Sequence, residues 1–238
     1  IPRRHRAVNH EAVLRRHVLQ ASACVTALSG SVIAPAQQST PAEPAFAKTL
    51  RERVAAEGVG LSVAVIDGAD VQFFSAGVKS AGQPQPTDAD TLYEYGSITK
   101  TFTALLLADM VVRKELALED SVETVLPKGL QLRDSQGAPI QCADLAVHRS
   151  GLPRLPANMT EATGDDPYRS YGHNELWRFF STWKGDRERD AKWEYSNLGY
   201  GMLAEALALR AGRSYEALLQ ERVLQPLGLQ SMSLAFRG

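Results

Sequence analysis

The chain has 238 residues, of which 44% are hydrophobic and 22% are charged, and its formal net charge at pH 7 is −1. This is the composition of an ordinary globular protein that is long enough to bury a substantial hydrophobic core. A net charge so close to zero argues against a nucleic-acid partner and against binding to an anionic membrane surface.

The N-terminal segment, residues 1–36, differs in composition from the rest of the chain. It begins with a basic stretch that holds five arginines and one acidic residue, Glu11. An uncharged stretch of small and apolar residues, 18–36, follows and ends in Ala-Pro-Ala. This order is typical of a secretory signal peptide, whereas the glycine and proline in the stretch disfavour a buried or amphipathic helix. We therefore expect residues 1–36 to be a signal peptide and the protein to be exported, to a bacterial periplasm or to the cell exterior.

We expect the mature chain to have no integral membrane segment, no disulfide bond and no bound cofactor. The apolar stretch 18–36 is too short and too weakly apolar for a stable membrane span. Without it, Cys142 is the single cysteine, and a lone buried cysteine is more often a small hydrophobe than a catalyst. The sequence contains no cluster of His, Cys and acidic residues with the spacing of metal ligands.

A polar linker, residues 37–44, precedes the expected folded domain, residues 45–238. Apolar residues at helical spacing predict a first helix that stops at Gly58. Residues 60–77 predict two apolar strands joined by a tight turn at Asp67-Gly68. Both strands are apolar enough that we expect at least one face of the hairpin to be covered.

The second part of the sequence is mostly helical. A nearly continuous apolar run over 98–113 predicts a buried central helix. Further helices are expected within 114–127, 142–156, 173–183, 196–212 and 214–224, with a small hairpin at 130–140 and a long loop at 154–172. The fold class is therefore α+β, although two strands alone are too few for a stable sheet.

The sequence GSITK, residues 96–100, places a serine and a lysine three residues apart at the start of the apolar run. On a helix, Lys100 would stand one turn above Ser97. A serine becomes a nucleophile when a base lies within hydrogen-bonding reach, and a deprotonated lysine is such a base. The alternative is a serine N-cap followed by a surface lysine. Ser181 and Lys184 share the spacing without a following apolar helix, so spacing alone does not identify a nucleophile.

A second motif, Tyr195-Ser196-Asn197, lies just ahead of a predicted helix. In an extended segment, the tyrosine and the asparagine point to the same side of the chain. A phenol can relay protons to a leaving group, and a carboxamide can hold both a lysine and a substrate amide. A helix cap beside a packed aromatic residue is the alternative for this motif in isolation.

Together, the two motifs resemble the serine β-lactamase and penicillin-binding-protein superfamily, which carries an S-x-x-K element with companion motifs. The Tyr-x-Asn companion is similar to that of the class C β-lactamase branch, whose relatives include DD-peptidases and carboxylesterases. DLAVHRSGLPRLP and VLQPLGLQSM are also similar to family segments, and the resemblance covers roughly residues 45–235. It implies a β-lactamase/transpeptidase-like fold, with a helical region packed on an antiparallel sheet of which only the N-terminal hairpin is present.

The resemblance also implies the roles of the motif residues. Ser97 would be the acylated nucleophile, Lys100 its proton acceptor and Tyr195 the general acid and base for the leaving group. Asn197 would orient the lysine and bind substrate. The substrate would be a β-lactam, a D-Ala-D-Ala peptide from peptidoglycan, or a small ester. We expect His148 to shape a turn rather than to catalyse.

Two other classes of function stay open at this point. A β-lactam sensor or an inactive peptidoglycan-binding homologue would use the same cleft without efficient turnover. A structural or interaction protein with a chance motif would form no covalent adduct. The sequence indicates no oligomeric state.

The third motif of the family, Lys-Thr-Gly or a variant of it, is not found in this sequence. In the family, this motif lies in a C-terminal block that completes the sheet and supplies the second N–H donor of the oxyanion hole. Its absence and the unpartnered hairpin lead us to expect that the chain lacks the C-terminal part of the domain. Removal of one oxyanion donor costs about 10²–10³-fold in kcat, so we expect such a chain to be a poor catalyst.

Overall fold

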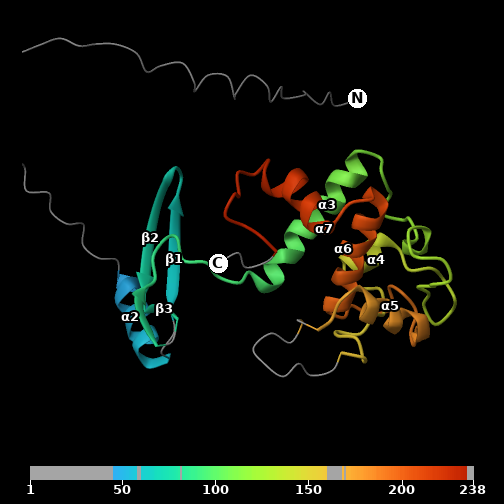
Figure 1. Cartoon of the computed structure of the whole chain (residues 1–238), viewed down its shortest axis with the longest axis horizontal. Coiled ribbons are helices and arrows are strands. Elements are labelled where there is room, and N and C mark those ends of the chain that lie inside the picture. The colour runs from blue at the N-terminus through green and yellow to red at the C-terminus, as the bar shows by residue number, and fades with distance from the viewer. Residues whose placement is uncertain (1–44, 58–59, 81, 160–167, 169, 235–238) are drawn as a thin grey trace, which may run out of the picture. The chain divides into compact units, whose positions relative to one another are not determined.

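The computed structural model describes residues 45–57, 60–80, 82–159, 168 and 170–234. The chain divides into two compact units, Ile1–Thr91 and Leu92–Gly238 (Figure 1). The expected signal peptide and linker lie outside the described residues. No helix in the described part of the chain has the length and apolar character needed to cross a membrane.

The first unit contains helix α2 (Ala45–Glu57) and the predicted hairpin of β1 (Leu61–Asp67) and β2 (Asp70–Ala76). The strands are antiparallel in a continuous register that closes at the pair Asp67–Asp70, so the turn prediction is confirmed. Helix α2 contacts β2. A second small hairpin, β3 (Val78–Ser80) with β4 (Gln83–Pro86), was not predicted because its strands are short and polar.

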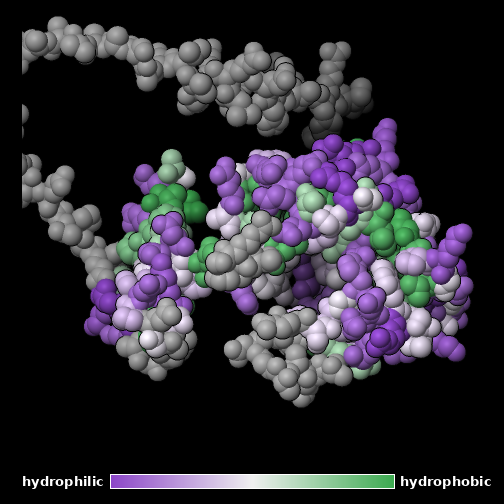
Figure 2. Space-filling view, viewed as in Figure 1, coloured by the Kyte–Doolittle hydropathy of each residue, from purple (hydrophilic) through white to green (hydrophobic). Residues whose placement is uncertain are grey.

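One face of the first hairpin exposes its apolar side chains. Ile66, Val71 and Phe73 are 70%, 50% and 57% exposed, and Figure 2 shows hydrophobic residues on the surface of this unit. Among the described residues, β1 and β2 pair only with each other. On the other face, Leu61, Val63 and Phe74 are half-buried, and α2 contacts β2. One face of the hairpin is therefore covered in part, as expected, and the other is open.

The second unit is helical, and α6 (Asn197–Ala211) lies at its centre (Figure 1). Its other elements are a 3-10 turn at Gly96–Ile98, α3 (Thr99–Val112), a 3-10 turn at Val122–Thr124, α4 (Cys142–Ala146), α5 (His173–Thr182), α7 (Tyr215–Leu219) and a π-helical turn at Gln220–Leu224. The helix α6 contacts α3, α4 and α7. The expected hairpin at 130–140 is reduced to a single bridge between Arg133 and Pro139.

The core of this unit forms where α3 and α4 meet α6. Met202, Leu203 and Leu207 of α6 are fully buried, as are Leu106 and Met110 of α3. The helix α3 buries only one face, although its apolar run continues around the helix. Leu105 and Val112 on α3 are 49% and 81% exposed, so the helix predicted to be buried is buried on one face only.

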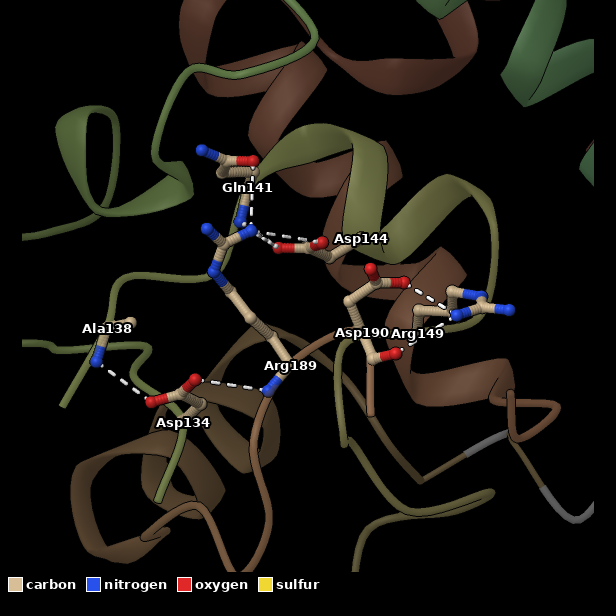
Figure 3. A network of polar contacts seen from close by, with 7 residues as sticks. All are labelled: Asp134, Ala138, Gln141, Asp144, Arg149, Arg189 and Asp190. Carbon is tan, nitrogen blue, oxygen red and sulfur yellow. Dashed lines mark hydrogen bonds and ion pairs between the residues drawn. The ribbon is translucent and has the colours of Figure 1, made fainter. Parts of the chain in front are cut away.

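A polar network anchors the segment that leads into the Tyr-Ser-Asn motif (Figure 3). The backbone N–H of Arg189 donates to Asp134 Oδ2 at 3.1 Å, and its guanidinium donates to the buried Asp144 at 3.3 Å. One residue further on, Asp190 accepts from the Arg149 guanidinium at 2.7 Å. The Arg189 bonds are partly buried and the Arg149–Asp190 pair is exposed, and charge-assisted bonds such as these are stronger than neutral ones. The network therefore fixes the path of the chain toward Tyr195.

The same segment begins at Gly185, and we predict that Gly185→Ala destabilises the protein by about 1–3 kcal/mol. A Cβ at this position would lie 2.6 Å from the carbonyl oxygen of Arg133 and 2.6 Å from the carbonyl carbon of Asp134, both backbone atoms. Gly201→Ala on α6 is the matched control, since its Cβ meets no described atom within 4 Å. This control should gain about 0.5–1 kcal/mol from helix propensity. Urea unfolding of both variants measures the two changes, and equal midpoints would contradict the prediction.

Candidate active site

Ser97 lies in the 3-10 turn that runs directly into α3. The residue before it, Gly96, has φ +51°, a left-handed conformation that glycine adopts without a steric penalty. The turn is closed by a hydrogen bond of 3.1 Å from the Ile98 N–H to the Tyr95 carbonyl. Ser97 is exposed, so its hydroxyl is accessible to a ligand. Lys100 is half-buried, so protein atoms surround part of its side chain.

The structure brings the four predicted site residues together. Lys100 Nζ donates to Ser97 Oγ at 3.2 Å and to Asn197 Oδ1 at 2.8 Å. Tyr195 Oη donates to the same Ser97 oxygen at 2.5 Å, across 98 residues of sequence. Lys100 Nζ also lies 4.8 Å from the centre of the Tyr195 ring. Ser97 Oγ therefore lies between two groups that can exchange protons with it.

Ser196 explains why Tyr195 and Asn197 point toward Ser97 and Lys100. Its side chain, 1% exposed, caps α6 by accepting from the Gly199 N–H at 2.8 Å and donating to the Pro153 carbonyl at 2.6 Å. The residues on either side of this buried cap point the other way, as alternation in an extended segment requires. The helix-cap alternative thus holds for Ser196, while Tyr195 and Asn197 of the same motif face Ser97 and Lys100.

His148 shapes a turn, as expected, and it also holds the Tyr195 segment, which was not predicted. It has φ +61°, and its carbonyl accepts from the Glu194 N–H at 2.8 Å. Its Nδ1 accepts from the Ser196 N–H at 3.1 Å, and its ring lies 4.6 Å from the ring of Tyr195. Burial, followed by the charge of Lys100, lowers the pKa of His148 and favours the neutral imidazole that this acceptor role needs.

Positive charge around Tyr195 favours its ionised form. The interaction of its oxygen with Lys100 lowers the pKa of Tyr195 most, and the hydrogen bond with Ser97 lowers it further. Burial opposes this shift, and the charges of Lys100 and Arg154 add to it. The Arg154 guanidinium lies 5.2 Å from the centre of the Tyr195 ring. Arg154 is thus part of the site environment, although no motif singled it out.

We predict that Arg154→Met raises the pKa of Tyr195, because a neighbouring cation stabilises phenolate over phenol. In the variant, the Tyr195 phenol should lose its proton at a higher pH than in the unmodified chain. Titration of tyrosinate absorbance measures the change, and a Tyr195→Phe chain identifies the contribution of this residue. Tyr171, Tyr200 and Tyr215 ionise late because burial raises the pKa of each. A titration unchanged by Arg154→Met would contradict the prediction.

Two residues outside this group, Ser181 and Cys142, have side chains that could react but that make structural contacts. Ser181, in the last turn of α5, donates to the Arg178 carbonyl at 2.8 Å. The helix α5 ends at Thr182, so Lys184 lies beyond it and does not share a helix face with Ser181. Cys142 is buried in the core, and burial raises the pKa of its thiol to about 11. At neutral pH this cysteine is a thiol and a poor nucleophile.

Comparisons with known proteins identify the family to which this chain is similar. Residues 46–236 match the model of the family described as Beta-lactamase. The chain is 30% identical to the D-alanyl-D-alanine-carboxypeptidase/endopeptidase AmpH of Escherichia coli K12, over 88% of this chain and 55% of that protein. A solved β-lactamase/D-alanine carboxypeptidase from Yersinia pestis superimposes with a TM-score of 0.70 at 27% identity, covering 81% of this chain and 56% of that one. A class C β-lactamase from Rhodobacter sphaeroides superimposes with a TM-score of 0.60 at 29% identity, over 76% of this chain and 48% of that one.

These matches confirm the α+β, β-lactamase/transpeptidase-like fold class. The chain spans about half the length of the relatives named here. The family model itself matches most of the residues of this chain. The chain therefore belongs to the β-lactamase family.

Proposed function

We propose that this chain carries the acylation site of a serine hydrolase, with Ser97 as the nucleophile. The observation that supports the proposal best is the pair of hydrogen bonds on Ser97 Oγ, from Lys100 Nζ at 3.2 Å and from Tyr195 Oη at 2.5 Å. A hydroxyl held between an amine and a phenol has both an acceptor for its proton and a donor for a leaving group.

In the acylation step, Ser97 Oγ forms a bond to the carbonyl carbon of the substrate while its proton passes to Lys100 Nζ. The C–N bond of a β-lactam or peptide, or the C–O bond of an ester, then breaks. The leaving atom takes a proton from the Tyr195 phenol, which recovers one from Lys100. The net result is an acyl-Ser97 ester and a protonated leaving group.

In deacylation, the same groups transfer protons in the opposite direction. Water adds to the acyl carbon and gives a proton to Tyr195 or Lys100, and Ser97 Oγ leaves and recovers a proton. The electrostatics support this cycle, because the interactions with Lys100 and Ser97 lower the pKa of Tyr195 and so favour release of its proton. Asn197, bonded to Lys100 at 2.8 Å, would keep the amine in place during both steps.

We propose β-lactams, D-Ala-D-Ala peptides or small esters as substrates. Relatives named as β-lactamases and as D-alanyl-D-alanine carboxypeptidases support the first two classes. We further propose that residues 1–36 are a signal peptide, that 37–44 are a linker and that 45–238 belong to the hydrolase domain. The order of a basic stretch, an apolar stretch and Ala-Pro-Ala in residues 1–36 supports a periplasmic or extracellular location.

The proposal is tested by the intact mass of the folded chain after brief exposure to benzylpenicillin. We expect a mass gain equal to one penicillin per chain, located by digestion on the peptide that contains Ser97. A folded chain with no gain in mass would contradict the proposal. The lifetime of the adduct separates two roles, since a hydrolase releases the acyl group and a sensor retains it.

A further inference from the structure

The two neighbours of Tyr195 in the chain hold its backbone from the side opposite the site. In an extended segment, the side chains of Glu194 and Ser196 point away from the direction that Tyr195 takes. Both residues bind one neighbouring turn. The Glu194 N–H donates to the His148 carbonyl at 2.8 Å. The Ser196 hydroxyl donates to the Pro153 carbonyl at 2.6 Å, so the turn carries both neighbours of the phenol.

The Glu194 carboxylate is held by Arg187, whose side chain is 26% exposed. Arg187 Nη1 donates to Glu194 Oε2, and Nη2 donates to the Gly151 carbonyl at 3.4 Å. Gly151 packs closely on this arginine, since a Cβ there would lie 3.3 Å from Arg187 Cγ. The Arg187 carbonyl accepts from the Ser135 N–H at 3.1 Å, so its backbone is fixed as well. Arg187 therefore joins the Glu194 side chain to the turn that contains Gly151.

Arg187 is the main charge partner of Glu194. The hydrogen bond from Arg187 lowers the pKa of Glu194 more than any other group does, so the carboxylate is ionised at neutral pH. The same bond raises the pKa of Arg187. Lys192 Nζ also lies 3.9 Å from the carboxylate, but its side chain is 72% exposed and such contacts contribute little. The partly buried arginine therefore decides where the Glu194 side chain lies.

We propose that the Arg187–Glu194 pair positions Tyr195, by keeping its phenol within hydrogen-bonding distance of Ser97. Together with the buried Ser196, the pair fixes the backbone on both sides of the tyrosine, and the Tyr195 oxygen then lies 2.5 Å from Ser97 Oγ. Arg187 and Glu194 are positioning residues, since they act through Tyr195 and not on the substrate. The proposal deepens the proposed function and rests on it, because it names what holds the proton donor of the same site.

Titration of tyrosinate absorbance in Glu194→Ala tests the positioning without any substrate. A phenol that moves away from Lys100 and Ser97 loses the interactions that lower its pKa, so Tyr195 should ionise at a higher pH. Loss of the negative charge alone would have the opposite sign, because a nearby carboxylate disfavours phenolate. Subtraction of the curve of the same chain with Tyr195→Phe isolates this residue. A Tyr195 midpoint that is unchanged or lower would overturn the proposal.

The rate of acylation by benzylpenicillin is the second measurement. Glu194→Ala should slow acylation about 10–100-fold, because a displaced proton donor is costly. Glu194→Gln, which can still accept from Arg187, should recover part of this loss. The concentration of penicillin at half-maximal rate should stay within about threefold, since the pair does not bind the substrate. Glu188→Ala is the matched control, because it removes an exposed carboxylate of the same segment, and it should leave the rate unchanged.

A double variant shows whether the two residues act as a pair. Arg187→Met keeps the hydrocarbon stem that packs on Gly151 and removes the guanidinium. In this background, Glu194→Ala should slow acylation by less than about a further twofold. A full additional loss would overturn the pairing. A penicillin adduct with an unshifted Tyr195 would overturn this inference alone, whereas a raised Tyr195 midpoint in Glu194→Ala without any adduct on the unmodified chain would overturn the proposed function alone.

Discussion

Ser97→Ala is expected to abolish the penicillin adduct, with a loss of signal to below about 1% of the unmodified chain. The reason is covalent, since alanine has no oxygen that can form an acyl ester. The fold should be retained, because Ser97 is exposed and lies in a turn whose backbone hydrogen bond does not involve its side chain. Intact mass after penicillin exposure measures the adduct, and circular dichroism confirms that the variant is folded.

Ser181→Ala is the matched control for this experiment, because Ser181 and Lys184 repeat the spacing of Ser97 and Lys100. Ser181 lies at the end of α5 and already donates to the Arg178 carbonyl. We expect its removal to leave the adduct unchanged. An adduct that persists in Ser97→Ala, or that disappears in Ser181→Ala, would be incompatible with Ser97 as the nucleophile.

The sequence predicted the local geometry within each motif of the candidate site, because that geometry depends on a few neighbouring residues. The i, i+3 spacing of Ser97 and Lys100 and the alternation in the Tyr-Ser-Asn motif each determine geometry over a few residues. Their meeting across 98 residues does not follow from either motif. It was expected only because the pair of motifs resembles a known family. The Ser181 and Lys184 pair shows the limit of local spacing, since the end of α5 at Thr182 was needed to exclude it.

Contacts that depend on the path of the backbone could not be predicted. His148 holds the Tyr195 segment partly through its backbone carbonyl. Every residue has such a carbonyl, so the residue type does not predict this contact. Arg154 approaches the Tyr195 ring because its backbone carbonyl accepts from the Asn197 N–H at 3.0 Å. The extent of burial was also missed, because the apolar run in α3 continues around the helix and does not mark the face that packs on α6.

Lys100→Met is expected to lower the rate of acylation by penicillin by about 10²–10⁴-fold. Methionine keeps an unbranched side chain of similar length but cannot accept the proton of Ser97. The loss should be smaller than in Ser97→Ala, because the hydrogen bond from Tyr195 Oη to Ser97 Oγ at 2.5 Å does not require the lysine. The rate of mass gain at several penicillin concentrations separates the acylation step from binding.

Lys100 Nζ also donates a hydrogen bond to Asn197 Oδ1 at 2.8 Å. Loss of the amine therefore also releases the Asn197 carboxamide, which is a second way to slow acylation. Asn197→Ala isolates that effect, since it removes the same hydrogen bond and leaves the amine beside Ser97. If Lys100 acts as the proton acceptor, Lys100→Met must slow acylation at least tenfold more than Asn197→Ala does. Lys184→Met, which removes an exposed lysine, should leave the rate unchanged. An acylation rate in Lys100→Met within about threefold of the unmodified chain would show that the proton leaves Ser97 by another route, for which the Tyr195 phenol, with its lowered pKa, is the nearest candidate.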